Sequence, residues 1–193
     1  MTLLGGEGKI TLLKLARSVI KSALDKNVKV IWPETVASEL NEKKGCFVTL
    51  HKKGALRGCI GTIEPVKSLI TAVEDNALNA AIRDPRFPSL TVNELSDVDL
   101  EISVLSPPTV LEYQDHEDLK NKLKQGVHGV ILSKDWRIAT FLPQVWEQLP
   151  DIEVFLGHLC QKAGMADSCW MDKDIVIKIY EVEYFSEKDT TFH

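Results

Sequence analysis

Residues 46–61, CFVTLHKKGALRGCIG, have the alternation of a β-hairpin, and this hairpin decides the fold class. Apolar and polar residues alternate on both sides of a central Lys-Lys-Gly, whose Gly54 can supply the positive φ of a three-residue turn. The register that keeps one face apolar pairs Leu50 with Leu56. We therefore expect two antiparallel strands with one apolar face and one more polar face.

The polar face of this hairpin carries the candidate functional residues. In the expected register Cys46 and Cys59 face opposite sides, so they are poorly placed for a disulfide. Arg57 shares a face with Cys59, which predicts a guanidinium beside the thiol. Gly58 and Gly61 mark a bulge or a close approach of a ligand or another backbone. Because free cysteine is also among the most commonly buried residues, packing, ligand binding and catalysis all stay open for Cys59.

The segments that flank the hairpin alternate between helical and strand periodicity. The helical spacing of apolar residues predicts helices over 11–24, 64–84 (opening at Pro65) and 151–165. Period-two alternation predicts a strand over 98–104, a hairpin over 129–141 and one long strand over 175–185. Strands joined mainly by hairpins indicate an α+β fold with a mixed, mainly antiparallel sheet and packed helices. The length favours a single domain, residues 1–193, with room for two intertwined lobes.

Composition and charge exclude several classes of function. A net charge of −5 and the lack of an aromatic-basic stripe make nucleic acid an unexpected partner. The N-terminus has no signal-peptide pattern, and no window approaches the roughly 20 apolar residues of a membrane span, so we expect a cytoplasmic protein without a membrane partner. The four cysteines lack zinc or iron–sulfur spacing. We therefore expect four free thiols, no metal and no cofactor.

The stretch RDPRFPSL, residues 83–90, is the second candidate binding element. Arg83 and Arg86 flank Asp84 in a loop held by two prolines, and a fixed arginine can hold a carboxylate or phosphate in a forked grip. Alternatively, Arg83 complements the dipole of the preceding helix and Asp84 pairs with a neighbouring arginine. Both interpretations stay open.

A catalytic Cys59 would need a base, and His128 is the candidate. His128 lies between two glycines in GVHGVIL, residues 126–132, which gives the backbone freedom to bring the imidazole to a rim. A solvated or capping histidine in a turn is the alternative interpretation.

Taken in order, several stretches of the chain resemble the AMMECR domain family. They are GCFVTL, LRGCIGTIEP, NALNAAIRDPRFPSL, LEISVLSPP, GVHGVIL, TFLPQVW and FLGHLCQKAGM. The resemblance spans nearly the whole chain and includes the family's hallmark, here Leu56 to Gly61. It implies an α+β fold, and it implies a pathway shared with Memo-type and radical S-adenosylmethionine proteins. This chain lacks the C-x-x-x-C-x-x-C cluster motif, so any radical chemistry would belong to such a partner.

Two classes of function follow from these residues. In the first, the chain is a recognition module in which Arg57, Gly58, Gly61, Arg83, Asp84 and Arg86 line a cleft for an anionic small molecule or a protein partner. In the second, it is an enzyme or enzyme subunit that uses Cys59 as a nucleophile or group carrier, with His128 as the base. Whether the protein is an enzyme stays open. Because no base lies within reach of Cys59 along the hairpin, we favour the recognition module.

Overall fold

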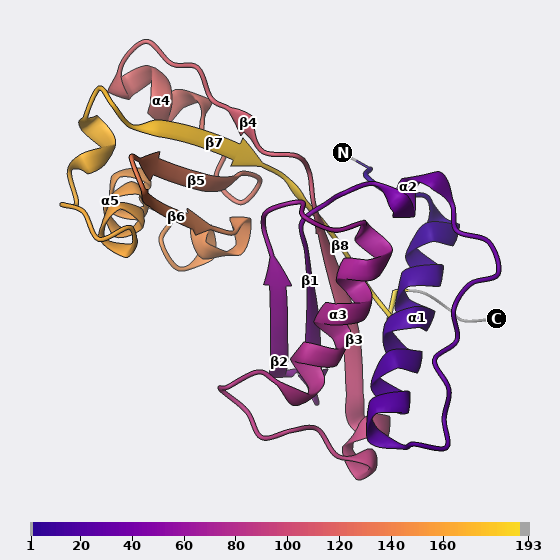
Figure 1. The fold of residues 1–193 in the computed structure, drawn as a ribbon. Helices are drawn as coiled ribbons and strands as arrows, with labels where there is room; N and C mark the ends of the chain where they lie inside the picture. Colours follow the sequence, from indigo (N-terminus) through magenta and orange to yellow (C-terminus); the bar gives the residue numbers. More distant parts are fainter. Residues whose placement is uncertain (1, 190–193) are drawn as a thin grey trace. The chain divides into compact units, whose positions relative to one another are not determined.

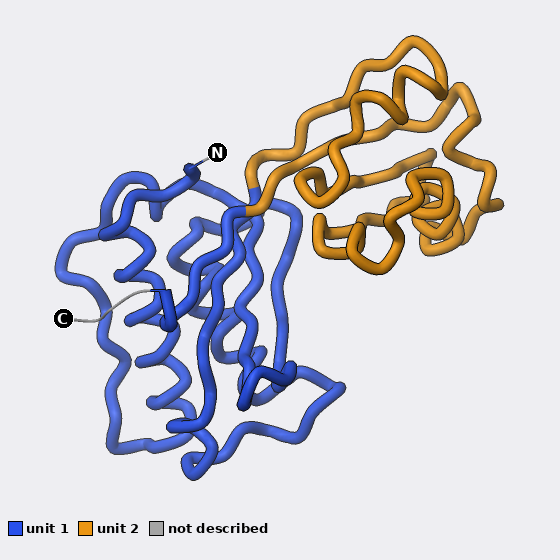
Figure 2. The backbone as a smooth tube through the Cα atoms, turned by 180° about the vertical axis from the view of Figure 1, so that it is seen from behind, with its two compact units in different colours: residues 1–105, 183–193 blue, residues 106–182 orange. Residues whose placement is uncertain are grey.

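The strands form two separate four-stranded sheets in the computed structural model, which describes residues 2–189. The chain divides into two units (Figure 2): unit 1 comprises residues 1–105 and 183–193, and unit 2 comprises residues 106–182. The predicted α+β class is confirmed, but the strands are shared between two sheets and do not form a single one.

Unit 1 is a sheet with helices packed on one of its faces (Figure 1). Its elements are α1 (Gly6–Leu24), α2 (Ser38–Asn41), β1 (Cys46–Lys52), β2 (Ala55–Thr62), α3 (Leu69–Ile82), the 3-10 helix η1 (Val92–Asp97), β3 (Val98–Leu105) and the returning strand β8 (Val182–Ser186). The strand order is β2-β1-β3-β8, and β1 runs antiparallel to both of its neighbours. Apolar residues of α1 and α3, such as Leu12 and Val73, are fully buried with Val48 and Leu100 of the sheet, so the core lies on the helical side.

Unit 2 is a smaller sheet with its own core. Its elements are β4 (Thr109–Val110), α4 (His116–Lys122), β5 (Gly129–Lys134), β6 (Arg137–Phe141), η2 (Pro143–Glu147), α5 (Ile152–Lys162), η3 (Cys169–Met171) and β7 (Val176–Tyr180). The strand order is β4-β7-β5-β6. Phe155 of α5 stacks on Trp146 with their ring centroids 3.6 Å apart, and both side chains are buried.

Two of the predicted element boundaries are wrong. Helix α3 begins at Leu69 and not near Pro65, because the Leu69 N–H is bonded to the Glu42 carbonyl and the preceding residues turn on themselves. The long strand predicted over 175–185 is broken at Glu181, so β7 and β8 belong to different sheets. Reciprocal bonds between Glu181 and Ser106 hold the chain at this break.

The β1–β2 hairpin has a different register from the predicted one. Lys53 and Gly54 both have positive φ, 53° and 84°, so they form a two-residue turn. Pairing then runs His51 with Leu56 but Leu50 with Gly58, which leaves Arg57 as the extra residue of a β-bulge. The prediction that Cys46 and Cys59 face opposite sides is confirmed, since Cys46 lies in the core and the half-buried Cys59 lies opposite Thr49.

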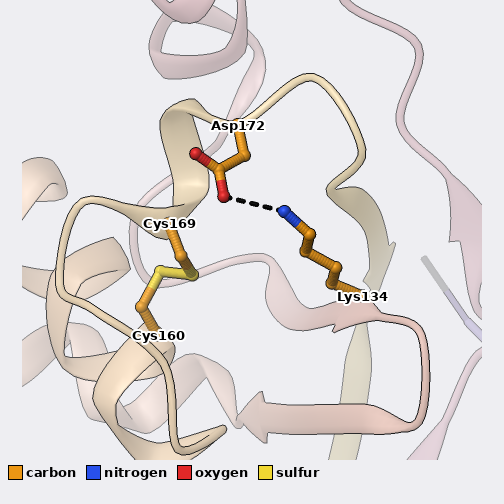
Figure 3. The surroundings of a disulfide bond; sticks show 4 residues. All are labelled: Lys134, Cys160, Cys169 and Asp172. Carbon is orange, nitrogen blue, oxygen red and sulfur yellow. Dashed lines mark hydrogen bonds and ion pairs between the residues drawn. A yellow bond between two sulfur atoms is a disulfide. The ribbon is translucent and has the colours of Figure 1, made fainter.

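The prediction of four free thiols is wrong, because Cys160 and Cys169 form a disulfide (Figure 3). Cys160 lies near the end of α5, where Gly164 with φ 72° reverses the chain and the Met165 N–H bonds to the Cys160 carbonyl. This reversal brings the Cα atoms of the two cysteines to 5.9 Å. Cys46 and Cys59 are free.

We expect thiol titration of the denatured protein to give two thiols without reductant and four after reduction. The two thiols are Cys46 and Cys59, and the two that appear on reduction come from the Cys160–Cys169 bond. A Cys160→Ser/Cys169→Ser variant should give two thiols under both conditions. Four thiols in the unreduced wild-type protein would contradict the disulfide.

No helix in residues 2–189 is long and apolar enough to cross a membrane.

Candidate functional site

The face of the unit 1 sheet turned away from its helices carries Cys59. Since β1 lies between β2 and β3, its two registers place residues of three strands side by side. The middle row across β2, β1 and β3 is Cys59, Thr49 and Glu101. All three residues are half-buried, so this row is a polar strip on a sheet face that unit 1's own helices do not cover.

The Cys59 thiol is held by a hydroxyl group. Thr49 Oγ1 donates a hydrogen bond to Cys59 Sγ at 3.3 Å. Among residues 2–189, no imidazole or carboxylate is hydrogen-bonded to this sulfur. A base that would activate the thiol is therefore not in place within the described part of the chain.

The backbone of Cys59 is hydrogen-bonded to the loop after α3 along the open edge of β2. Because β2 is the edge strand and Cys59 is a non-hydrogen-bonded partner of Thr49, its N–H and C=O point away from β1. Asp84 Oδ2 accepts from the Cys59 N–H at 2.9 Å, and Arg86 Nη2 donates to the Cys59 carbonyl at 2.9 Å. We call this arrangement the Asp84–Arg86 clamp.

The two residues of the clamp are joined to one another by a forked ion pair. Arg86 Nε donates to Asp84 Oδ1 at 3.0 Å and Arg86 Nη2 to Oδ2 at 2.7 Å. Oδ1 also accepts from the Arg86 N–H at 3.1 Å, so the loop closes on the Asp84 side chain. The Asp84 side chain is buried, whereas 55% of the Arg86 side chain is exposed.

These contacts fix the charge of the clamp. The Arg86 side chain, with the N–H groups of Cys59 and Arg86, holds the pKa of Asp84 well below its usual range, although burial opposes this. The hydrogen bonds to Asp84 raise the pKa of Arg86. The clamp is therefore a carboxylate and a guanidinium at neutral pH.

The two glycines of the motif are required by protein atoms. A Cβ on Gly58 would lie 2.2 Å from the Ala80 carbonyl oxygen of α3. A Cβ on Gly61 would lie 2.3 Å from the Phe47 ring and 2.4 Å from the Cys46 carbonyl oxygen. The sequence predicted that these glycines mark a bulge or a close approach of a ligand or another backbone. At Gly58 the structure shows the close approach of another backbone, that of α3.

Arg57 does not lie beside the thiol as predicted, because the bulge directs it to η1. Its Nε and Nη2 each donate to a carboxylate oxygen of Glu94 at 3.2 Å, and Lys52 Nζ reaches Glu94 at 2.9 Å. Arg57, and then Lys52, hold the pKa of Glu94 well below its usual range. The arginine that contacts Cys59 is Arg86.

The remaining candidates, Arg83 and His128, are not hydrogen-bonded to Cys59. Arg83 Nη1 donates to Asn79 Oδ1 at 3.2 Å, and Arg83 lines a separate cavity beside α3. His128 is buried in unit 2, where its Nδ1 accepts from the Lys124 N–H at 3.2 Å. Burial, and then the Lys124 charge, lower the pKa of His128. The ring therefore closes the turn between α4 and β5, and a role of His128 as base stays a prediction.

Sequence reasoning missed Thr49 and Glu101 as neighbours of Cys59. Thr49 lies beside Cys59 only in the observed register, and Glu101 joins the row through the separate pairing of β1 with β3. The alternation of apolar and polar residues in 98–104 was the signal that could have placed Glu101 on this face.

The fold and the clamp define a class of α+β protein. In this class the backbone of a cysteine on an edge strand is hydrogen-bonded to the Asp and Arg side chains of an Asp-x-Arg loop. The sequence profile of the AMMECR1 family matches residues 13–185, and the chain belongs to this family, which confirms the resemblance seen in the sequence.

The chain is also similar to archaeal proteins and to a solved structure over most of its length. A protein of Methanothermobacter thermautotrophicus is 40% identical over 182 residues, covering 94% of this chain and 94% of the relative. Protein MJ0810 of Methanocaldococcus jannaschii is 38% identical over 178 residues, covering 91% and 88%. The crystal structure of uncharacterized protein PH0010 from Pyrococcus horikoshii superposes with a TM-score of 0.81 at 35% identity, covering 97% of this chain and 95% of that chain.

Proposed function

We propose that the protein is a recognition module that binds a carboxylate or phosphate group at the Arg86 end of the clamp. The observation that carries this proposal is Arg86, whose guanidinium is hydrogen-bonded to Asp84 and to the Cys59 carbonyl while 55% of its side chain is exposed. Asp84 and the Cys59 carbonyl accept hydrogen bonds from the guanidinium, and the guanidinium carbon lies over the Phe87 ring, 5.6 Å from its centroid. A guanidinium ordered before binding loses little side-chain entropy when it takes up an anion.

Cys59 serves in this proposal as part of the wall beside the anion. Its backbone N–H and C=O are hydrogen-bonded to the clamp, and its sulfur accepts a hydrogen bond from the Thr49 hydroxyl. The anion belongs either to a small molecule or to an acidic segment of a protein partner, with Memo-type and radical S-adenosylmethionine proteins as the candidate partners. A cytoplasmic location stays part of the proposal, although the Cys160–Cys169 disulfide favours a less reducing environment.

The alternative function is an enzyme in which Cys59 is the nucleophile or group carrier. The row Cys59, Thr49 and Glu101 supports it, because a carboxylate lies one strand beyond the hydroxyl that contacts the thiol. In that case replacing Cys59 would abolish function, whereas the recognition module depends on Arg86.

We expect Arg86→Gln to weaken anion binding about 10- to 100-fold, the loss of one charge-assisted hydrogen bond or two. The protein is titrated with inorganic phosphate and, separately, with a hexaglutamate peptide, and the amide signals of Cys59 and Arg86 are followed by NMR. Cys59→Ser should change the affinity by less than about twofold. Arg137→Gln, which removes an exposed arginine of β6, is the matched control.

Because Arg86→Gln leaves a buried carboxylate unpaired, Arg86→Lys is measured beside it. Lysine keeps the charge next to Asp84 but cannot form the fork, so it should also weaken binding. Saturation by hexaglutamate alone identifies a protein segment, and saturation by phosphate alone identifies a small anion. No saturable shift with either probe, or full affinity in both Arg86 variants, would contradict the module.

A further inference from the structure

Unit 1 has a cavity of about 470 Å³ that is formed by residues other than those of the clamp. Its walls are the end of β2, the segment that leads to α3, and one side of α3 itself. The polar residues that line it are Thr62, Lys67, Asp75, Asn76, Asn79 and Arg83. Neither Asp84 nor Arg86 belongs to this lining, and the volume is within the range of small-molecule sites, roughly 300–1,000 Å³.

Asn76 is an unusual residue for its position in the helix. It is 5% exposed and lies on the buried side of α3, whose other buried residues are leucine, isoleucine, valine and alanine. Its Nδ2 donates to the Cys46 carbonyl at 3.2 Å and to Cys46 Sγ at 3.4 Å, so the orientation of the carboxamide is fixed. Burial of an amide costs free energy for each of its polar atoms that lacks a hydrogen-bond partner.

The Asn76 carbonyl oxygen is the unsatisfied atom of this amide. It accepts no hydrogen bond from residues 2–189. Within those residues, the side-chain nitrogen or oxygen atom that is fully buried and has no hydrogen-bond partner is Arg57 Nη1. Asn76 Oδ1 is therefore not fully buried, and we infer that it is accessible from the cavity that Asn76 lines. This oxygen calls for a hydroxyl or amine donor from whatever fills the cavity.

Arg83 supplies the opposite chemistry to the same cavity. Asn76 and Asn79 lie three residues apart on α3, and Arg83 follows Asn79 by four residues as the C-cap of the helix. Asn79 Oδ1 accepts from Arg83 Nη1 at 3.2 Å, which holds the guanidinium while its other N–H groups stay available. Arg83 forms no ion pair with any residue in 2–189, whereas the Lys67 and Asp75 charges compensate one another.

We propose that this cavity binds a small hydroxycarboxylate, with its carboxylate on Arg83 and a hydroxyl group donating to Asn76 Oδ1. The lining carries one net positive charge, that of Arg83, and is complementary to a ligand with one net negative charge. A polyol would leave Arg83 without an anion, and a simple fatty acid would leave Asn76 without a donor. The cavity therefore selects for both groups on one molecule.

Three probes of equal chain length separate these requirements. Gluconate has the carboxylate and the hydroxyls, hexanoate has the carboxylate alone, and sorbitol has the hydroxyls alone. The side-chain amide signals of Asn76 and Asn79 are followed by NMR during each titration. We expect a saturable shift with gluconate at a concentration at least tenfold lower than with either of the other two probes.

Variants then separate this site from the clamp. Arg83→Gln, at an exposed residue whose loss leaves no buried charge, should weaken gluconate binding tenfold or more and leave the hexaglutamate and phosphate titrations unchanged. Arg86→Lys should do the reverse. Equal affinity for all three probes, no saturable shift with gluconate, or full gluconate affinity in Arg83→Gln would overturn the proposal, whatever the outcome at Arg86.

Discussion

Replacing Asp84 by asparagine is expected to lower the free energy of unfolding by about 3 kcal/mol at neutral pH. The buried carboxylate accepts four hydrogen bonds, from the Cys59 N–H and from the Arg86 N–H, Nε and Nη2. An asparagine amide has one acceptor oxygen and turns an NH₂ group toward donors that need an acceptor. This loss of stability is at the lower end of the range for a broken buried ion pair. The reason is that the Arg86 side chain is half-exposed, so its charge can be solvated when Asp84 is replaced.

The effect of Asp84→Asn should also depend on pH. The pKa of Asp84 is lower in the folded protein than its ordinary value of about 4, so the carboxylate stabilises the fold above that pH. This contribution is lost as the pH falls below about 4 toward the lower pKa of the folded state. The difference in unfolding free energy between wild type and Asp84→Asn should therefore be constant from pH 5 to 8 and shrink below pH 4.

Urea denaturation at a series of pH values measures both quantities. Asp97→Asn, at an exposed carboxylate on η1, is the matched control and should change stability by less than about 0.5 kcal/mol. Hydrogen exchange of the Cys59 amide adds a local measurement, since this N–H loses its acceptor. Wild-type stability and unchanged Cys59 exchange in Asp84→Asn would contradict the clamp.

The hairpin shows what the sequence could and could not predict. Alternation over 46–61 was sufficient for the two strands and for the separation of Cys46 from Cys59. The predicted register was wrong because the observed one depends on Lys53 adopting a positive φ. This conformation costs a non-glycine residue only about 1–2 kcal/mol. The alternation of apolar and polar residues contains no information on so small a difference. That turn and the bulge at Arg57 together move the arginine from the thiol to Glu94.

Contacts between distant segments were the other limit. The loop 83–90 was recognisable as a rigid arginine-bearing element, and pairing of Asp84 with a neighbouring arginine was one of its two interpretations. That it would meet the edge of β2 at Cys59 depends on the packing of α3, which no local pattern contains. The Cys160–Cys169 disulfide likewise depends on the chain reversal at Gly164 rather than on a spacing motif.

The packing of α3 against β2 predicts a second large effect, in Gly58→Ala. The added Cβ would lie 2.2 Å from the Ala80 carbonyl oxygen and 3.2 Å from the carbonyl carbon. Because the obstacle is helix backbone and not a side chain that can rotate, α3 must move away from the sheet. We expect a loss of about 3 kcal/mol in the free energy of unfolding, as for a severe case of overpacking.

Gly6→Ala is the matched control for this substitution, since a Cβ there meets nothing within 4 Å in the first turn of α1. It should leave stability unchanged or raise it by a few tenths of a kcal/mol. Ala80 precedes Asp84 by only four residues. The shift of α3 should therefore also weaken the hydrogen bonds between the clamp and the Cys59 backbone. Faster exchange of the Cys59 amide in Gly58→Ala, but not in Gly6→Ala, would show that the glycine holds the site together. Equal stability of the two variants would mean that α3 does not press on β2 at this point, and the clamp would then need another support.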